Sequence, residues 1–125
     1  FPEEDNHMVL VDTSVWIDHF RNSNSLLIEL LNEGEVFSHP YIIGELACGN
    51  IKHRHELLSL LQSLPQSTAV EHEEILLFIE NHNIMGKGIG YIDIAILCSA
   101  LLSGISLWTF DKKLGIIAEM FGLIT

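Results

Sequence analysis

The sequence has 125 residues, 48% of them hydrophobic, and a formal net charge of −11 at pH 7. This length predicts a single domain, and the apolar content is sufficient for one hydrophobic core. The acidic balance argues against a protein that binds nucleic acid through a broad basic surface, because phosphate repels such a chain. No apolar run approaches the ~20 residues that a membrane-spanning helix needs.

The first seven residues differ from the rest of the chain. Phe1–His7 are mostly polar or acidic, and Met8 directly precedes a strand-like run. We interpret residues 1–7 as a remnant of protein expression and expect a single domain over residues 8–125. That domain has a net charge of −8, because the first seven residues include three acids and no Lys or Arg. No signal peptide is recognisable, so we expect a cytoplasmic protein.

Apolar periodicity and turn residues predict strands that alternate with helices. Strands are expected at Val9–Asp12, Val36–His39, Ser67–Val70, Ser106–Thr109 and Leu123–Thr125. Helices are expected from Thr13 to a turn at Asn22–Asn24 and at Ser25–Asn32, Pro40–Gly49, Ile51–Leu64, Glu71–His82, Ile92–Leu102 and Lys112–Phe121. The helix at Ile92–Leu102 is apolar on nearly all sides and is expected at the centre. This alternation predicts a helix-rich α/β sandwich around a parallel sheet.

The two cysteines, Cys48 and Cys98, fall in apolar helical stretches. We expect both to be buried free thiols rather than a disulfide. No CxxC or other zinc-ligand spacing occurs in the sequence. Cysteine chemistry is therefore not expected to carry the function.

Four acidic residues stand in apolar surroundings: Asp12, Glu45, Asp93 and Asp111. Asp12 and Asp111 follow predicted strands, whose carboxyl ends form the edge where open parallel sheets place their active sites. An ionised carboxylate beside an apolar core is unfavourable unless something compensates its charge. Only six Lys and Arg residues are present, so a bound divalent cation is the natural candidate. Hard carboxylate oxygens suit Mg²⁺ or Mn²⁺.

Each acid also has a purely structural explanation. Asp12, Asp93 and Asp111 stand at predicted helix starts, where an acid caps the helix or favours its positive end. Glu45 alone suits a boundary position with a solvated carboxylate. The set as a whole favours a functional explanation, because two cations ~4 Å apart can clamp the attacking and leaving oxygens of a phosphodiester. No GxSxG, P-loop or Rossmann glycine pattern points to a different chemistry.

Four segments resemble, in order, the motifs of PIN-domain ribonucleases, particularly the VapC-type toxins. These segments are Val9–Arg21, Gly44–Leu46, Gly88–Leu97 and Leu107–Leu114. The resemblance covers residues 8–125 and implies a PIN-like three-layer sandwich, with a parallel sheet of four or five strands and helices on both faces. It also implies the toxin component of a toxin–antitoxin pair, an endoribonuclease that uses Mg²⁺, or Mn²⁺ in its place, and a metal-activated water to hydrolyse RNA.

The resemblance assigns the catalytic and metal-binding roles to Asp12, Glu45, Asp93 and Asp111. Asp12 and Asp93 would be metal ligands, Glu45 would bind or orient the metal or its water, and Asp111 would help to hold a second ion or act through water. Thr13, Ser14 and Thr109 would support these acids by hydrogen bonds. The implied partners are RNA, a VapB-like antitoxin whose C-terminal segment occupies the groove, and a second copy of the chain. No membrane partner is expected.

Three other classes were compared with this interpretation. A haloacid-dehalogenase-type phosphatase also places an Asp after its first strand, but it requires a second Asp where this chain has Ser14. A receiver-like phosphoacceptor requires paired acids after the first strand and a Lys after the last, and neither is evident. A non-catalytic RNA- or protein-binding PIN-like module remains the alternative, and it predicts that Asp12→Asn leaves function intact.

Two basic or glycine-rich segments admit two explanations each. The densest basic stretch, Lys52–His55, suits a solvated helix start or a contact with RNA phosphate. The loop Gly86–Gly90, which carries Lys87, suits a connector that lets Asp93 face the pocket or a segment that approaches the RNA backbone. We favour the structural explanation for both segments.

Overall fold

The structure is a computed structural model that describes residues 7–124. The predicted remnant at residues 1–7 therefore lies outside the described residues, except for His7. Thr125, the last residue of a predicted strand, also lies outside them. Within residues 7–124, no helix is both long enough and apolar enough to cross a bilayer.

The centre of the fold is a parallel sheet with the strand order β2-β1-β3. The strands are β1 (Val9–Val11), β2 (Val36–Phe37) and β3 (Ser106–Trp108), and Val9 pairs with both Val36 and Ser106. All three residues of the middle strand, β1, are buried. A parallel strand covered on both faces is apolar throughout, which explains its Val-Leu-Val sequence.

The parallel sheet agrees with the sequence prediction, but it has three regular strands within residues 7–124 rather than four or five. The other two predicted strands are reduced to single parallel bridges, Ser38 with Gln66 and Leu107 with Ile124. Ser67 still donates its backbone N–H to the Ser38 carbonyl at 2.9 Å, but beyond Ser67 the backbone bonds to helical side chains instead of a neighbouring strand. The Thr68 N–H donates to Ser103 Oγ at 2.8 Å, and the Thr68 carbonyl accepts from Ser99 Oγ.

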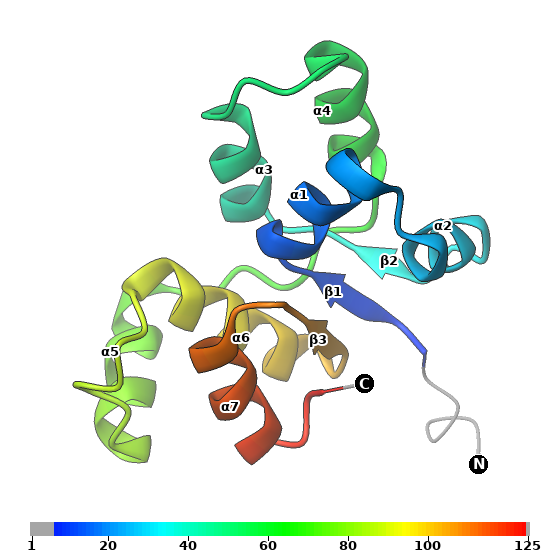
Figure 1. Cartoon of the computed structure of the whole chain (residues 1–125). Helices are drawn as coiled ribbons and strands as arrows, with labels where there is room; N and C mark the ends of the chain where they lie inside the picture. The colour runs from blue at the N-terminus through cyan, green and yellow to red at the C-terminus, as the bar shows by residue number, and fades with distance from the viewer. Residues whose placement is uncertain (1–6, 125) are drawn as a thin grey trace.

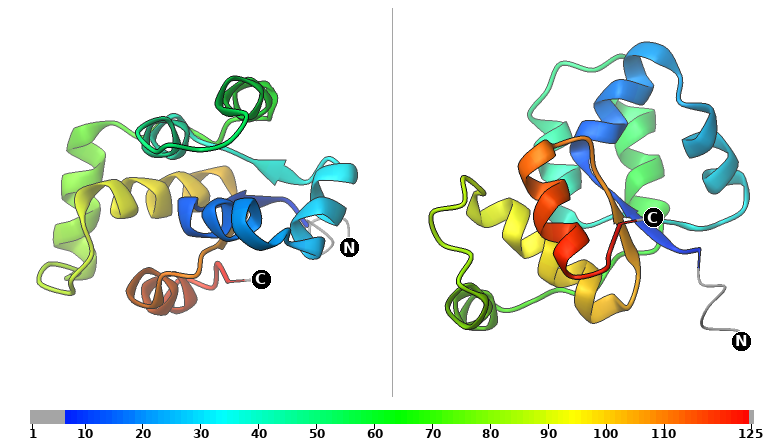
Figure 2. Two further views of the ribbon diagram at one scale, coloured as in Figure 1. Left: turned by 45° about the horizontal axis from the view of Figure 1, so that its top comes forward. Right: turned by 60° about the horizontal axis from the view of Figure 1, so that its bottom comes forward.

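Helices follow every strand. They are α1 (Thr13–Asn22), α2 (Ser25–Asn32), α3 (Pro40–Ala47), α4 (Arg54–Ser63), α5 (His72–His82), α6 (Tyr91–Ser103) and α7 (Lys112–Met120). The first four gather on the β2 side of β1, and the last three gather on the β3 side (Figures 1 and 2). The predicted start of α4 at Ile51 is wrong, because His53 adopts the left-handed conformation (φ 52°, ψ 41°) that a right-handed helix cannot include.

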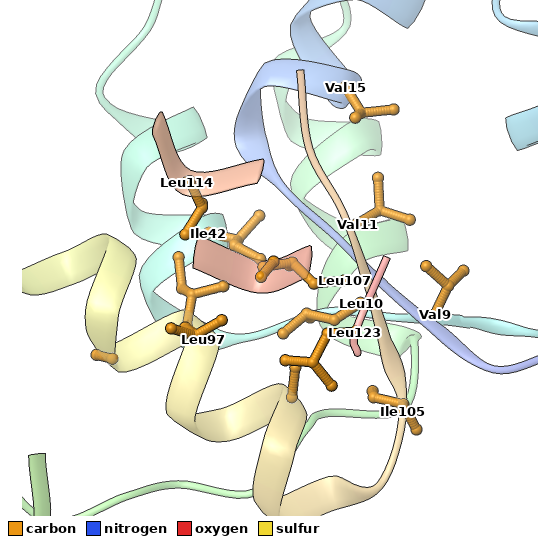
Figure 3. Packing of buried hydrophobic residues seen from close by; sticks show 14 of the residues in the cluster. Val9, Leu10, Val11, Val15, Ile42, Leu97, Ile105, Leu107, Leu114 and Leu123 are labelled. Carbon is orange, nitrogen blue, oxygen red and sulfur yellow. The ribbon is translucent and has the colours of Figure 1, made fainter. Parts of the chain in front are cut away.

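The core lies where β1, β3 and α6 meet. Leu10, Leu107 and Leu97, one from each element, are fully buried there (Figure 3). Helix α6 is buried over the whole stretch Ile94–Ala100, which confirms its predicted central position. This core fixes the ends of the strands and the starts of the following helices, where Asp12, Asp93 and Asp111 lie.

The cysteine prediction is half correct. Both thiols are free, and Cys98 is buried on α6. Burial raises the pKa of the Cys98 thiol to about 11, so it stays protonated at neutral pH. The prediction of burial is wrong for Cys48, which is exposed because it ends α3 and leads into the turn at Gly49.

Candidate active site

Three helices contribute acids to the site: α1, which directly follows β1, α7, which directly follows the neighbouring strand β3, and α6, whose first turn lies next to α5 (Figures 1 and 2). Each of them starts with one of the predicted acids. Asp12 is the N-cap residue of α1, Asp93 lies in the first turn of α6, and Asp111 is the N-cap residue of α7. The amino-terminal end of a helix carries partial positive charge, so all three acids stand where the helix dipole favours an anion.

The side chain of Asp12 does not cap its helix. It makes no capping hydrogen bond to α1. Instead its Oδ2 accepts hydrogen bonds from Ser14 Oγ at 2.8 Å and Thr109 Oγ1 at 2.7 Å. No residue of the described chain donates to Oδ1. Asp12 as a residue is only 5% exposed, and the two hydroxyls orient one carboxylate oxygen and leave the other for a ligand.

The same two hydroxyls join Asp12 to the segment after β3. Ser14 Oγ accepts from the Phe110 N–H at 2.9 Å, and Thr109 Oγ1 accepts from the Asp111 N–H at 3.0 Å. Each hydroxyl therefore donates to Asp12 and accepts from the backbone that leads into Asp111. This network holds the ends of β1 and β3 in a fixed relation.

Asp111 and Glu45 are exposed, and each has a hydrogen-bond partner. Asp111 Oδ1 accepts from the Leu114 N–H at 2.9 Å, so its structural explanation as a helix cap holds. Glu45 projects from α3, and its Oε1 accepts from Thr13 Oγ1 at 2.8 Å. Since Thr13 directly follows Asp12, this bond brings α3 to the start of α1.

The pKa of Asp93 responds to the negative charges of the other three acids. Its pKa is raised to about 6, first by burial and then by the negative charges of Asp12, Asp111 and Glu45. The four acids from separate segments therefore lie within electrostatic range of one another. Among residues 7–124 the ion pair found joins His53 to Glu56, and none involves these four acids. Positive charge is missing from the cluster itself.

The donor set fits a hard divalent cation. All four side chains offer carboxylate oxygens, and their mutual repulsion is the charge that such an ion would neutralise. Within the described part of the chain, no three His, Cys, Asp or Glu side chains are arranged to hold a metal ion by themselves. Mg²⁺ typically binds one or two carboxylates and completes its coordination with waters and substrate phosphate. The residues present suit that mode of binding.

Cationic residues border the acids on two sides. A cavity of about 560 Å³ beside Glu45 is lined by Arg21, Lys52 and His53 together with apolar side chains. On the other side, the loop that precedes Asp93 lies against α7, because a Cβ added at Gly88 would stand 2.8 Å from Lys113 Nζ. Gly88 also has a φ of +77°, which favours glycine.

Two exposed tyrosines next to the acids did not stand out in the sequence. Tyr41 lies one helical turn before Glu45 on α3, and Tyr91 lies two residues before Asp93 on α6. Both rings are exposed. The four-residue spacing between Tyr41 and Glu45 was the available signal, since residues i and i+4 share a helix face.

The fold and the acidic cluster together define a class of protein. Residues 9–120 match the family model described as PIN domain. The chain is 46% identical to Ribonuclease VapC32 from two strains of Mycobacterium tuberculosis over 108 residues, which cover 86% of this chain and 87% of that protein. It is 30% identical to Ribonuclease VapC1 of Methanocaldococcus jannaschii over 115 residues, which cover 89% of this chain and 81% of that protein. The chain belongs to the PIN-domain family, among the VapC-type ribonucleases, which confirms the resemblance found in the sequence.

Proposed function

We propose that this chain is a divalent-metal-dependent endoribonuclease and the toxin of a toxin–antitoxin pair. The observation that carries the proposal is the meeting of four carboxylates, with the pKa of Asp93 raised to about 6. Such a concentration of negative charge beside a core is unfavourable without a cation. The names of the relatives, ribonucleases of the VapC type, support RNA as the substrate.

The proposed catalytic residues are the four acids. Asp12 and Asp93 bind the cation, Glu45 binds or orients the cation or the attacking water, and Asp111 helps to hold a second cation or acts through water. When bound, Mg²⁺, for which Mn²⁺ would substitute, would supply an activated water and would neutralise charge on the phosphodiester. Ser14 and Thr109 orient Asp12 through the bonds to Oδ2, and Thr13 orients Glu45.

The proposal extends to the whole domain and its partners. We propose one domain over residues 8–125. The bridges at Gln66 and Ile124 support edge strands that complete a four- or five-stranded sheet between two helical layers. The VapC names of the relatives support a VapB-like antitoxin as partner, and we also propose a homodimer and a cytoplasmic location.

Cleavage of RNA with and without divalent ions tests the proposal. The purified chain is expected to cut RNA in Mg²⁺ or Mn²⁺ and to stop when EDTA is added. Asp12→Asn and Asp93→Asn should each abolish most of this cleavage. Activity that persists in chelator would contradict the metal mechanism. A biological activity unchanged by Asp12→Asn would favour the non-catalytic RNA- or protein-binding module instead.

A further inference from the structure

We propose that Tyr41 and Tyr91 bind the RNA by stacking on unpaired nucleobases next to the scissile phosphodiester. This inference rests on the proposed function, because it assigns substrate-positioning residues to the same site. It makes the substrate at this site an RNA segment whose bases are free to leave the helical stack.

The first observation is where the exposed aromatic rings lie. Within residues 7–124, the aromatic side chains that are strongly exposed are Tyr41 (43%), Tyr91 (36%) and Phe110 (53%). The other aromatic rings in this range pack wholly or partly against the core. Each exposed ring is close in sequence to an acid of the cluster: Tyr41 precedes Glu45 by one turn, Tyr91 precedes Asp93 by two residues, and Phe110 directly precedes Asp111. Exposed rings are thus concentrated at the site.

The second observation is that each tyrosine ring lies against a histidine ring. The rings of His39 and Tyr41 lie 5.0 Å apart between centroids, and the Nδ1 of the buried His39 accepts from the Tyr41 N–H at 2.9 Å. His72 Nδ1 and the Tyr91 hydroxyl form a hydrogen bond of 2.7 Å, and these rings are 5.4 Å apart. Rings that are already oriented lose less conformational entropy when a ligand stacks on them.

The third observation is that the two tyrosines stand on helices that carry acids of the cluster. Tyr41 stands on the helix that carries Glu45, and Tyr91 on the helix that carries Asp93. The two exposed rings therefore add aromatic surface beside these acids.

The chemistry of this surface favours an unpaired base as the occupant. Stacking on an aromatic side chain contributes about 1–3 kcal/mol per base and needs a base that is not already stacked in a duplex. It also needs no positive charge on the protein. A chain with a net charge of −11 cannot gain most of its RNA affinity from a broad basic surface. Stacking is a source of RNA affinity that does not depend on positive charge.

Equilibrium RNA binding by ring-removing variants tests the inference. The assay uses fluorescence anisotropy of a short unstructured RNA in Mg²⁺, with the full chain carrying Asp12→Asn so that cleavage does not interfere. In this background Tyr41→Leu and Tyr91→Leu are each expected to weaken binding about 5- to 150-fold, the range that corresponds to stacking energies of about 1–3 kcal/mol. Tyr41→Phe and Tyr91→Phe should stay within about twofold, because the ring remains. Leu102→Ala, at an exposed residue near the other end of α6, is the control and should change nothing.

Several results would overturn the inference. These are leucine variants that bind as tightly as the parent, a duplex of the same sequence that binds as well as the single strand, or no RNA binding by the parent. Leucine variants that lose self-association in sedimentation while RNA affinity is unchanged would assign the tyrosines to an interface between copies. Because binding is measured without cleavage, failure of the unsubstituted chain to cut RNA would sink the proposed function alone.

Discussion

At the scale of single residues, the acids of the site carry different combinations of structural and chemical roles. Asp111 caps a helix with one oxygen, and Glu45 accepts a bond from Thr13. Asp12 forgoes capping and is oriented by two hydroxyls. Asp93 has the raised pKa because it is partly buried among the others. The unfavourable free energy of bringing the four carboxylates together therefore shows mainly in the raised pKa of Asp93.

Asp93→Asn is expected to stabilise the chain when no divalent ion is present. The pKa of Asp93 is raised from 3.8 to about 6 in the folded state, so the folded chain loses stability as pH rises through this window, and the variant avoids the loss. A shift of two units corresponds to about 3 kcal/mol, and solvent screening at this partly exposed group reduces the gain to about 1 kcal/mol. Chemical denaturation in EDTA at pH 4 and pH 7.5 measures it.

The gain of Asp93→Asn should be present at pH 7.5 and nearly absent at pH 4. Glu80→Gln, at an exposed acid of α5, is the control and should show no such pH dependence. A marked loss of stability at both pH values would instead mean that Asp93 serves as a structural residue of the α6 start.

At the scale of elements, apolar patterning predicted the sheet direction, the helix order and the central place of α6. It did not predict that the segment after Gln66 would bond to Ser99 and Ser103 of α6, because that choice depends on which side chains the fold brings near. It also missed the left-handed backbone of His53 that delays α4. No local signal in the sequence marks that conformation.

The candidate site was predictable only in part for the same reason. The order of four motifs indicated the acids, while periodicity alone left three of them as ordinary helix-end residues. The bonds from Ser14 and Thr109 to a single oxygen of Asp12 join residues far apart in the chain. The exposure of Tyr41 and Tyr91 likewise depends on which helix faces the core leaves uncovered.

A matched pair of substitutions on α6 tests the central place of this helix. Leu97 is fully buried, whereas Leu102 is 59% exposed on the same helix. Leu97→Ala is expected to lower the free energy of unfolding by about 3 kcal/mol, because it removes buried methyl groups and leaves a cavity. Leu102→Ala should change it by less than about 0.5 kcal/mol. Urea denaturation of both variants provides the comparison, and equal losses would contradict the described core.

At the scale of the whole molecule, an acidic chain is proposed to act on an acidic polymer. The net charge of −11 opposes RNA binding, while cationic residues lie near the acids on two sides. A cation at the site and a basic partner segment would both reduce the repulsion. The negative net charge therefore suggests that RNA binding is controlled by the cation or the basic partner segment that neutralises the acidic cluster.

Expression of the chain in a bacterial host is expected to arrest growth unless the antitoxin is co-expressed. Unregulated hydrolysis of cellular RNA is the physical cause. Asp12→Asn expressed at the same level should allow normal growth, because a proposed metal ligand is lost while the fold remains. Growth is followed by colony counts and protein level by immunoblot. Harmless expression of the unsubstituted chain at that level would count against the toxin role.

The central claim is that four carboxylates form one cation site, and the titration of Asp93 tests it most directly. Carboxyl-carbon NMR of the chain in EDTA should show Asp93 titrating near pH 6, and Asp12→Asn should lower that midpoint because one neighbouring charge is removed. Addition of Mg²⁺ should lower the midpoint further, because a bound cation favours the ionised carboxylate. An Asp93 that titrates near its ordinary value and does not respond to Mg²⁺ would contradict the claim.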